Sequence, residues 1–120
     1  MNNVDEIVKK ALSFVGQKEK GANNSGFENE WFEDLLRSVG WTSGQEWCGY
    51  AQMAVLKGLI DEDKYKLLSP SVNQTYMNFK KAIPEALVKE PKAGYLVLFS
   101  LYKDGNITWK GHIGLVTSIV

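Results

Sequence analysis

Apolar residues in the first third of the chain recur at the spacing of amphipathic helices, which predicts two helices there. The apolar face of the first helix is made of Val4, Ile7, Val8, Ala11, Leu12 and Val15. Gly16 follows, at a position where a glycine commonly ends a helix. The second helix comes after a turn-like loop, and its apolar stripe is made of Phe27, Trp31, Leu35 and Val39. On this stripe, Trp31 is expected to be a core residue.

Two more helices are predicted in the middle of the chain. The third begins near Cys48, and its shared face is made of Cys48, Ala51, Gln52 and Val55. The charged stretch 61–66 is predicted to be irregular. A serine N-cap at Ser69, followed by Pro70 at the first helical position, predicts the start of the fourth helix. Its inner face is made of Val72, Tyr76 and Phe79, and Pro84 marks its end.

The last third of the chain changes to strand patterns. Residues 95–102 form a continuous β-prone run, residues 103–106 supply turn chemistry, and residues 107–109 resume the strand, which predicts a hairpin. A strand pattern also starts at His112, whose face includes Gly114 while Ile113 faces the other way. Helices first and antiparallel strands last predict an α+β fold. At 120 residues the chain fits a single domain, 1–120.

Charge and composition exclude several classes of function. Fourteen Lys and Arg balance fourteen Asp and Glu, so a basic stripe for nucleic acid is not expected. One cysteine cannot form an internal disulfide, and with one histidine it falls short of a zinc site unless carboxylates join, so we expect neither a disulfide nor a metal. The N-terminus lacks a signal-peptide pattern, and no segment reaches the roughly 20 apolar residues of a membrane span. We therefore expect the chain to be cytoplasmic when made.

The only cysteine and the only histidine are the candidates for catalysis. A helix N-terminus favours a thiolate because unpaired N–H groups and the helix dipole stabilise negative charge, and Cys48 stands at such a position. A nucleophilic cysteine needs a general base, and His112, 64 positions later, can meet it in the fold. Gly111 and Gly114 flank the histidine and suit an open site. Taken singly, each candidate also fits a structural role, the cysteine as a small buried hydrophobe.

The contexts of these residues resemble the NlpC- and CHAP-type cell-wall hydrolases, the bacterial and phage branch of the papain-like cysteine peptidases. The matching stretches, in order along the chain, are 11–19, Trp47-Cys48, 91–94 and 111–116. The resemblance implies a papain-like fold of N-terminal helices packed on a small antiparallel sheet. It implies Cys48 as nucleophile, His112 as base and no cofactor, acting on an amide bond of a peptidoglycan peptide. Family members place a polar residue that orients the histidine on the strand after the histidine strand. Because this chain stops at Val120, before such a strand, the domain is expected to lack its C-terminal strand or strands.

Five further residues are candidates for substrate or oxyanion contacts. They are Gln45, Glu46, Trp47, Glu19 and Trp109. Glu19 matches a glutamate that recurs in one subgroup of the family. If no further strand follows Val120, Glu19 is also the first candidate for a third catalytic residue, and Asn106 is the second.

Three functions stay open at this point. The first is an endopeptidase or amidase, such as an endolysin, that acts on the wall after release or delivery. The second is a weak or inactive wall-binding or phage structural module on the same fold. The third is an intracellular deconjugating peptidase or acyltransferase. Neither the bond that is cut nor the oligomeric state follows from the sequence.

Overall fold

The protein combines helices in its first part with an antiparallel hairpin in its last, which confirms the predicted α+β class. The computed structural model describes residues 3–22 and 24–118, with only the backbone for 3, 100–103 and 107–110. The elements in these ranges are α1 (Asn3–Leu12), α2 (Glu30–Arg37), α3 (Cys48–Leu56), α4 (Glu62–Tyr65), α5 (Val72–Ala82), the 3-10 helix η1 (Pro84–Ala86), β1 (Leu96–Lys103) and β2 (Asn106–Leu115). Of the described helices, none has the length and apolar character needed to cross a membrane.

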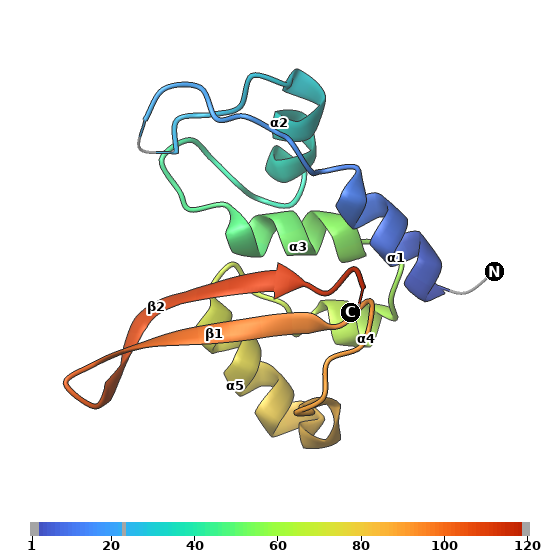
Figure 1. The fold of residues 1–120 in the computed structure, drawn as a ribbon, viewed down its shortest axis with the longest axis vertical. Helices are drawn as coiled ribbons and strands as arrows, with labels where there is room; N and C mark the ends of the chain where they lie inside the picture. Colours follow the sequence, from blue (N-terminus) through green and yellow to red (C-terminus); the bar gives the residue numbers. More distant parts are fainter. Residues whose placement is uncertain (1–2, 23, 119–120) are drawn as a thin grey trace.

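The elements stack in layers around α3. Figure 1 shows α3 between α2 on one side and the β1–β2 hairpin on the other, with α5 beyond the hairpin. α3 packs against β2, while α5 packs against both strands. Apart from Cys48, Gln52 and Met53, every residue of α3 is buried, as expected for a helix enclosed by neighbours on several sides. The turn end of the hairpin projects beyond the helices (Figure 1).

The hairpin forms where the turn residues predict it. Asp104 and Gly105 both have positive φ, 53° and 81°, as the two central residues of a type I′ turn require. The strands pair from Lys103 with Asn106 to Leu96 with Leu115, with one irregularity between residues 100 and 102. β2 is continuous, so the separate strand start predicted at His112 is wrong, and the histidine lies inside this strand.

The buried face of α2 differs from the predicted stripe. The side chain of Asn29 accepts a hydrogen bond from the Phe32 N–H at 3.2 Å, and this cap starts the helix at Glu30. Phe32 and Leu36, four residues apart, then face the core. Trp31 is 54% exposed, so its prediction as a core residue is wrong, although its ring contacts Phe14 edge-on at 6.0 Å.

The region before α5 also departs from expectation. The stretch 61–66 contains the short helix α4, so its prediction as irregular is wrong. α5 begins two residues later than predicted because the Ser71 hydroxyl, which accepts from the Gln74 N–H at 3.2 Å, is its N-cap. The buried Thr75 hydroxyl accepts from the Ser69 N–H at 2.9 Å and donates to the Ser69 carbonyl at 3.1 Å. Thr75 therefore takes the inner position predicted for Tyr76, which is exposed.

Candidate active site

Cys48 is the first residue of α3, which confirms the predicted helix start. Its thiol is free and half-buried. The preceding residue, Trp47, is the N-cap and makes no side-chain capping bond to the first turn. Gly49 is buried directly against Pro70, where a Cβ would meet the Pro70 carbonyl oxygen. The cysteine thus stands at a helix N-terminus whose first-turn N–H groups are not used by the N-cap side chain.

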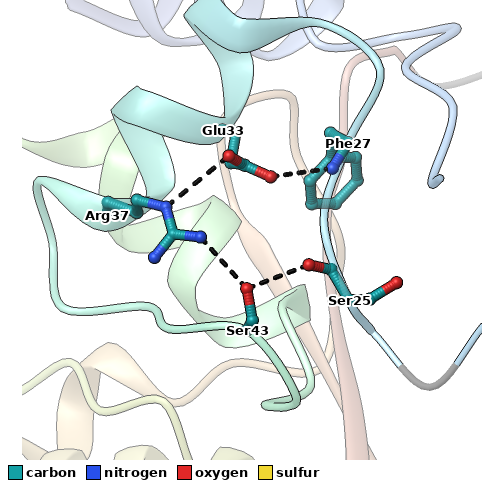
Figure 2. Close-up of polar contacts among 5 residues, drawn as sticks. All are labelled: Ser25, Phe27, Glu33, Arg37 and Ser43. Carbon is teal, nitrogen blue, oxygen red and sulfur yellow. Dashed lines mark hydrogen bonds and ion pairs between the residues drawn. The ribbon is translucent and has the colours of Figure 1, made fainter. Parts of the chain in front are cut away.

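The chain segment that leads into Cys48 is attached to α2 and to residues 24–25 of the loop before it. Figure 2 shows that Arg37 Nη2 donates to the Ser43 hydroxyl at 3.0 Å, and this hydroxyl donates to the Ser25 carbonyl at 2.9 Å. The Gly44 N–H donates to the Asn24 carbonyl at 2.8 Å. These bonds connect two loops that are far apart in sequence, and they fix the approach to α3.

Glu33 holds the other end of the same network (Figure 2). Its Oε1 accepts from the Phe27 N–H at 3.0 Å, and its Oε2 lies 3.6 Å from Arg37 Nε. The bond from the Phe27 backbone, aided by the positive charges of Lys20 and Arg37, lowers the pKa of this carboxyl below its ordinary value. A negative Glu33 is therefore the form that stabilises these loops.

Gln45, a predicted oxyanion or substrate contact, uses its side-chain oxygen inside its own loop. Its Oε1 accepts from both the N–H and the hydroxyl of Thr42, each at 3.0 Å. Its backbone carbonyl accepts from Trp41 Nε1 at 2.8 Å. The amide nitrogen of Gln45 is the part of this side chain available to a substrate. Glu46, another predicted contact, is exposed beside it.

Glu19 is in direct contact with Trp47, the residue that precedes Cys48 in the sequence. Trp47 Nε1 donates to Glu19 Oε1 at 2.6 Å. The indole also packs edge-on against Phe27 at 5.3 Å and Phe32 at 6.2 Å between ring centroids. The structure therefore brings two of the predicted contact residues together through the residue that precedes Cys48, and the half-buried indole also packs against the core.

His112 is exposed on β2, directly opposite Phe99 of β1. The two rings are stacked, with centroids 6.3 Å apart and planes at 26°. Beside the histidine, Gly114 faces open space, whereas a Cβ at Gly111 would lie 2.6 Å from the Phe99 carbonyl oxygen and 3.2 Å from Val72 Cβ. Gly111, before His112, is thus closely packed, whereas beyond the histidine Ile113 is buried and the position of Gly114 is open.

The segment 70–72 connects the surroundings of the two candidates. Pro70 contacts Gly49, the residue after Cys48, and Val72 contacts Gly111, the residue before His112. Together with the packing of α3 against β2, these contacts place both candidates on elements that share a neighbour. A direct approach of the thiol to the imidazole stays a prediction. The predicted contact residue Trp109 lies on β2, and its side chain falls outside the described residues.

An apolar groove of about 820 Å³ lies elsewhere, between α1, α5 and β1. Its lining includes Ile7, Phe79, Tyr95 and Leu98 but neither Cys48 nor His112. Within the described ranges, no three His, Cys, Asp or Glu side chains gather as metal ligands would. The groove is therefore separate from the two residues that the sequence singles out for catalysis.

No protein-family model, curated protein or solved structure matches this chain significantly.

Proposed function

We propose that the protein is a papain-like cysteine hydrolase of the NlpC and CHAP type, which cleaves an amide bond of a peptidoglycan peptide. One observation carries the proposal. The only cysteine begins a buried helix, and this helix packs against the strand that holds the only histidine. A helix start favours a thiolate, and a histidine on a neighbouring element supplies the base that such a thiol requires.

The reaction begins with transfer of the Cys48 thiol proton to His112 as the sulfur attacks the substrate carbonyl carbon. When the tetrahedral intermediate collapses, the carbon–nitrogen bond breaks and His112 returns the proton to the leaving amine. Water then attacks the thioester, His112 takes one of its protons, and the carboxylic acid product leaves as the thiol is restored. The backbone N–H of Cys48 is the proposed oxyanion donor, with the Gln45 side-chain amide as a second.

The remaining candidates take supporting roles in the proposal. Trp47, held by Glu19, fixes the chain direction just before the nucleophile. Glu46 and Trp109 are proposed as substrate contacts on the two sides of the site. Glu19 accepts a hydrogen bond from the N-cap residue Trp47, and this bond supports a positioning role for it rather than the role of third catalytic residue.

Digestion of purified peptidoglycan, followed by mass spectrometry of the released fragments, tests the proposal. The wild-type chain should release fragments with a new amine and a new carboxylic acid, and their masses identify the bond that is cut. Cys48→Ala and His112→Ala should release none, while Gly105→Asn, at the distant hairpin turn, should act as the wild type does. Binding of the wild-type chain to the wall without cleavage would contradict the hydrolase proposal and would favour a wall-binding module.

A further inference from the structure

The exposed ring of Phe99 lies beside the proposed base in an arrangement that the reaction alone does not require. Phe99 and His112 are directly paired across the antiparallel strands, so their side chains leave the same face of the hairpin. The ring planes differ by 26° at a centroid separation of 6.3 Å, which is an offset stacked arrangement. Phe99 is nevertheless 54% exposed, so half of this large apolar side chain is not used for the core.

Among the residues whose side chains the structure describes, Phe99 is the ring that the imidazole contacts. Gly114, the next residue on this side of β2, has no side chain and faces open space. Gly111 precedes the histidine on the opposite face, where its close approach to the Phe99 carbonyl oxygen fixes the backbone. Packing at Gly111 thus holds the backbone next to His112, whereas the imidazole itself contacts the ring of Phe99.

From this geometry we infer that Phe99 is a positioning residue for His112. Its ring occupies one side of the imidazole and restricts the side-chain rotamers that the base adopts. This inference rests on the proposed function, in which His112 must hold one orientation to take a proton from Cys48 and return it to the leaving amine. Stacked aromatic pairs shift a conformational equilibrium by roughly 2- to 12-fold, so the effect on turnover should be of that size.

The experiment combines a measurement of the imidazole with a measurement of turnover. His112 is the only histidine, so its ring resonances and its Hα–Hβ couplings are free of overlap with those of another histidine. In the wild type, the couplings should report one dominant χ1 rotamer, and ring protons of residues 99 and 112 should show mutual nuclear Overhauser effects. Phe99→Leu should average the couplings and lower kcat on a peptidoglycan peptide roughly 2- to 12-fold with little change in KM.

Two comparisons separate positioning from general stability. Phe99→Tyr keeps the stacked ring and should retain the wild-type couplings and kcat. Tyr95→Leu removes another exposed aromatic ring, four residues before Phe99 and just outside β1, and should leave His112 unchanged. If Phe99→Leu does not fold, Phe99→Met provides the same test with a longer apolar side chain.

The outcomes distinguish this inference from the proposed function. Unchanged His112 couplings in Phe99→Leu, or averaged couplings with unchanged kcat, would overturn the positioning role while leaving an active wild type as a hydrolase. A wild type that does not cleave would overturn the proposed function and the catalytic meaning of Phe99 with it, even if the rings are found stacked.

Discussion

Trp47 donates a hydrogen bond from its indole nitrogen to the carboxylate of Glu19, 28 positions earlier in the chain, at 2.6 Å. Glu19 also pairs with Phe27 in an isolated β-bridge, so the carboxylate projects from a segment that is itself attached to the core. Because Trp47 is the N-cap of α3, this bond holds the residue that immediately precedes the proposed nucleophile.

A double-mutant cycle measures how much this hydrogen bond contributes to the free energy of unfolding. Trp47→Phe keeps the packing on Phe27 and Phe32 but removes the donor, and Glu19→Ala removes the acceptor. The coupling free energy of unfolding between them should be about 1 kcal/mol, a moderate value because the bond is charged but exposed to solvent. Urea unfolding of the four proteins gives this quantity. A coupling near zero would show that the bond does not hold the N-cap residue in solution.

Three glycine-to-alanine substitutions test the packing around the two candidates. Gly49→Ala and Gly111→Ala should each lower the free energy of unfolding by about 1–3 kcal/mol, because each Cβ meets a backbone carbonyl oxygen, that of Pro70 or of Phe99. Gly114→Ala is the matched control in the same strand as Gly111, since its Cβ enters open space. Its unfolding midpoint in urea should stay at or slightly above that of the wild type.

Equal losses for all three variants would contradict this account, because the cost would then come from the strand and helix backbones in general. Gly114→Ala has a second use. If the open face beside His112 admits the substrate, this variant should lose activity while its stability is retained.

Glu33 makes stability depend on pH in the acidic range. Its folded-state pKa lies below the ordinary value of 4.5, so its contribution is fully present above about pH 4.5 and is lost as the pH falls through the folded-state value. Glu33→Gln keeps an acceptor for the Phe27 N–H but does not titrate. Between about pH 7 and pH 3.5, the urea midpoint should therefore fall more for the wild type than for Glu33→Gln. Identical pH profiles of the two proteins would show that the carboxylate does not hold these loops.

Local signals in the sequence predicted the elements that depend on neighbouring residues. The Asp104-Gly105 pair specifies its turn through positive φ angles, and the helix start at Cys48 follows from the change between loop and apolar residues. The start of α5 was predicted wrongly because Ser69 and Ser71 are both good caps, and the choice depends on the buried Thr75 hydroxyl, which holds Ser69.

Contacts between distant segments could not be predicted in the same way. The sequence singled out Glu19 and Trp47 separately, but their bond depends on the pairing of Glu19 with Phe27, whose ring packs against α2. Phe99 belonged to a β-prone run without a distinguishing feature, and only the register of the hairpin places it opposite His112. Trp31 and Phe32 are both large aromatic residues, and Phe32 is the buried one because its face of α2 meets Phe27 and Trp47 from distant segments.

Alkylation kinetics test whether the thiol and the imidazole interact. In the native protein, Cys48 should react with iodoacetamide at neutral pH faster than the same cysteine does in the urea-unfolded chain, because the helix terminus and the proposed contact with the imidazole both favour the thiolate. His112→Ala should slow the native reaction, whereas Phe99→Tyr should not. If the thiol does not react in the native protein and reacts only after unfolding, Cys48 is a structural residue.

The most direct test of the central claim is intact-protein mass spectrometry after mixing with a peptidoglycan peptide and quenching with acid. Attack by Cys48 should leave the acyl part of the peptide on the protein as a thioester, which hydroxylamine removes and which maps to Cys48. His112→Ala should form this adduct far more slowly, and Cys48→Ala should not form it. Cleavage at equal rates by the wild type and Cys48→Ala, with no adduct on either protein, would contradict the account.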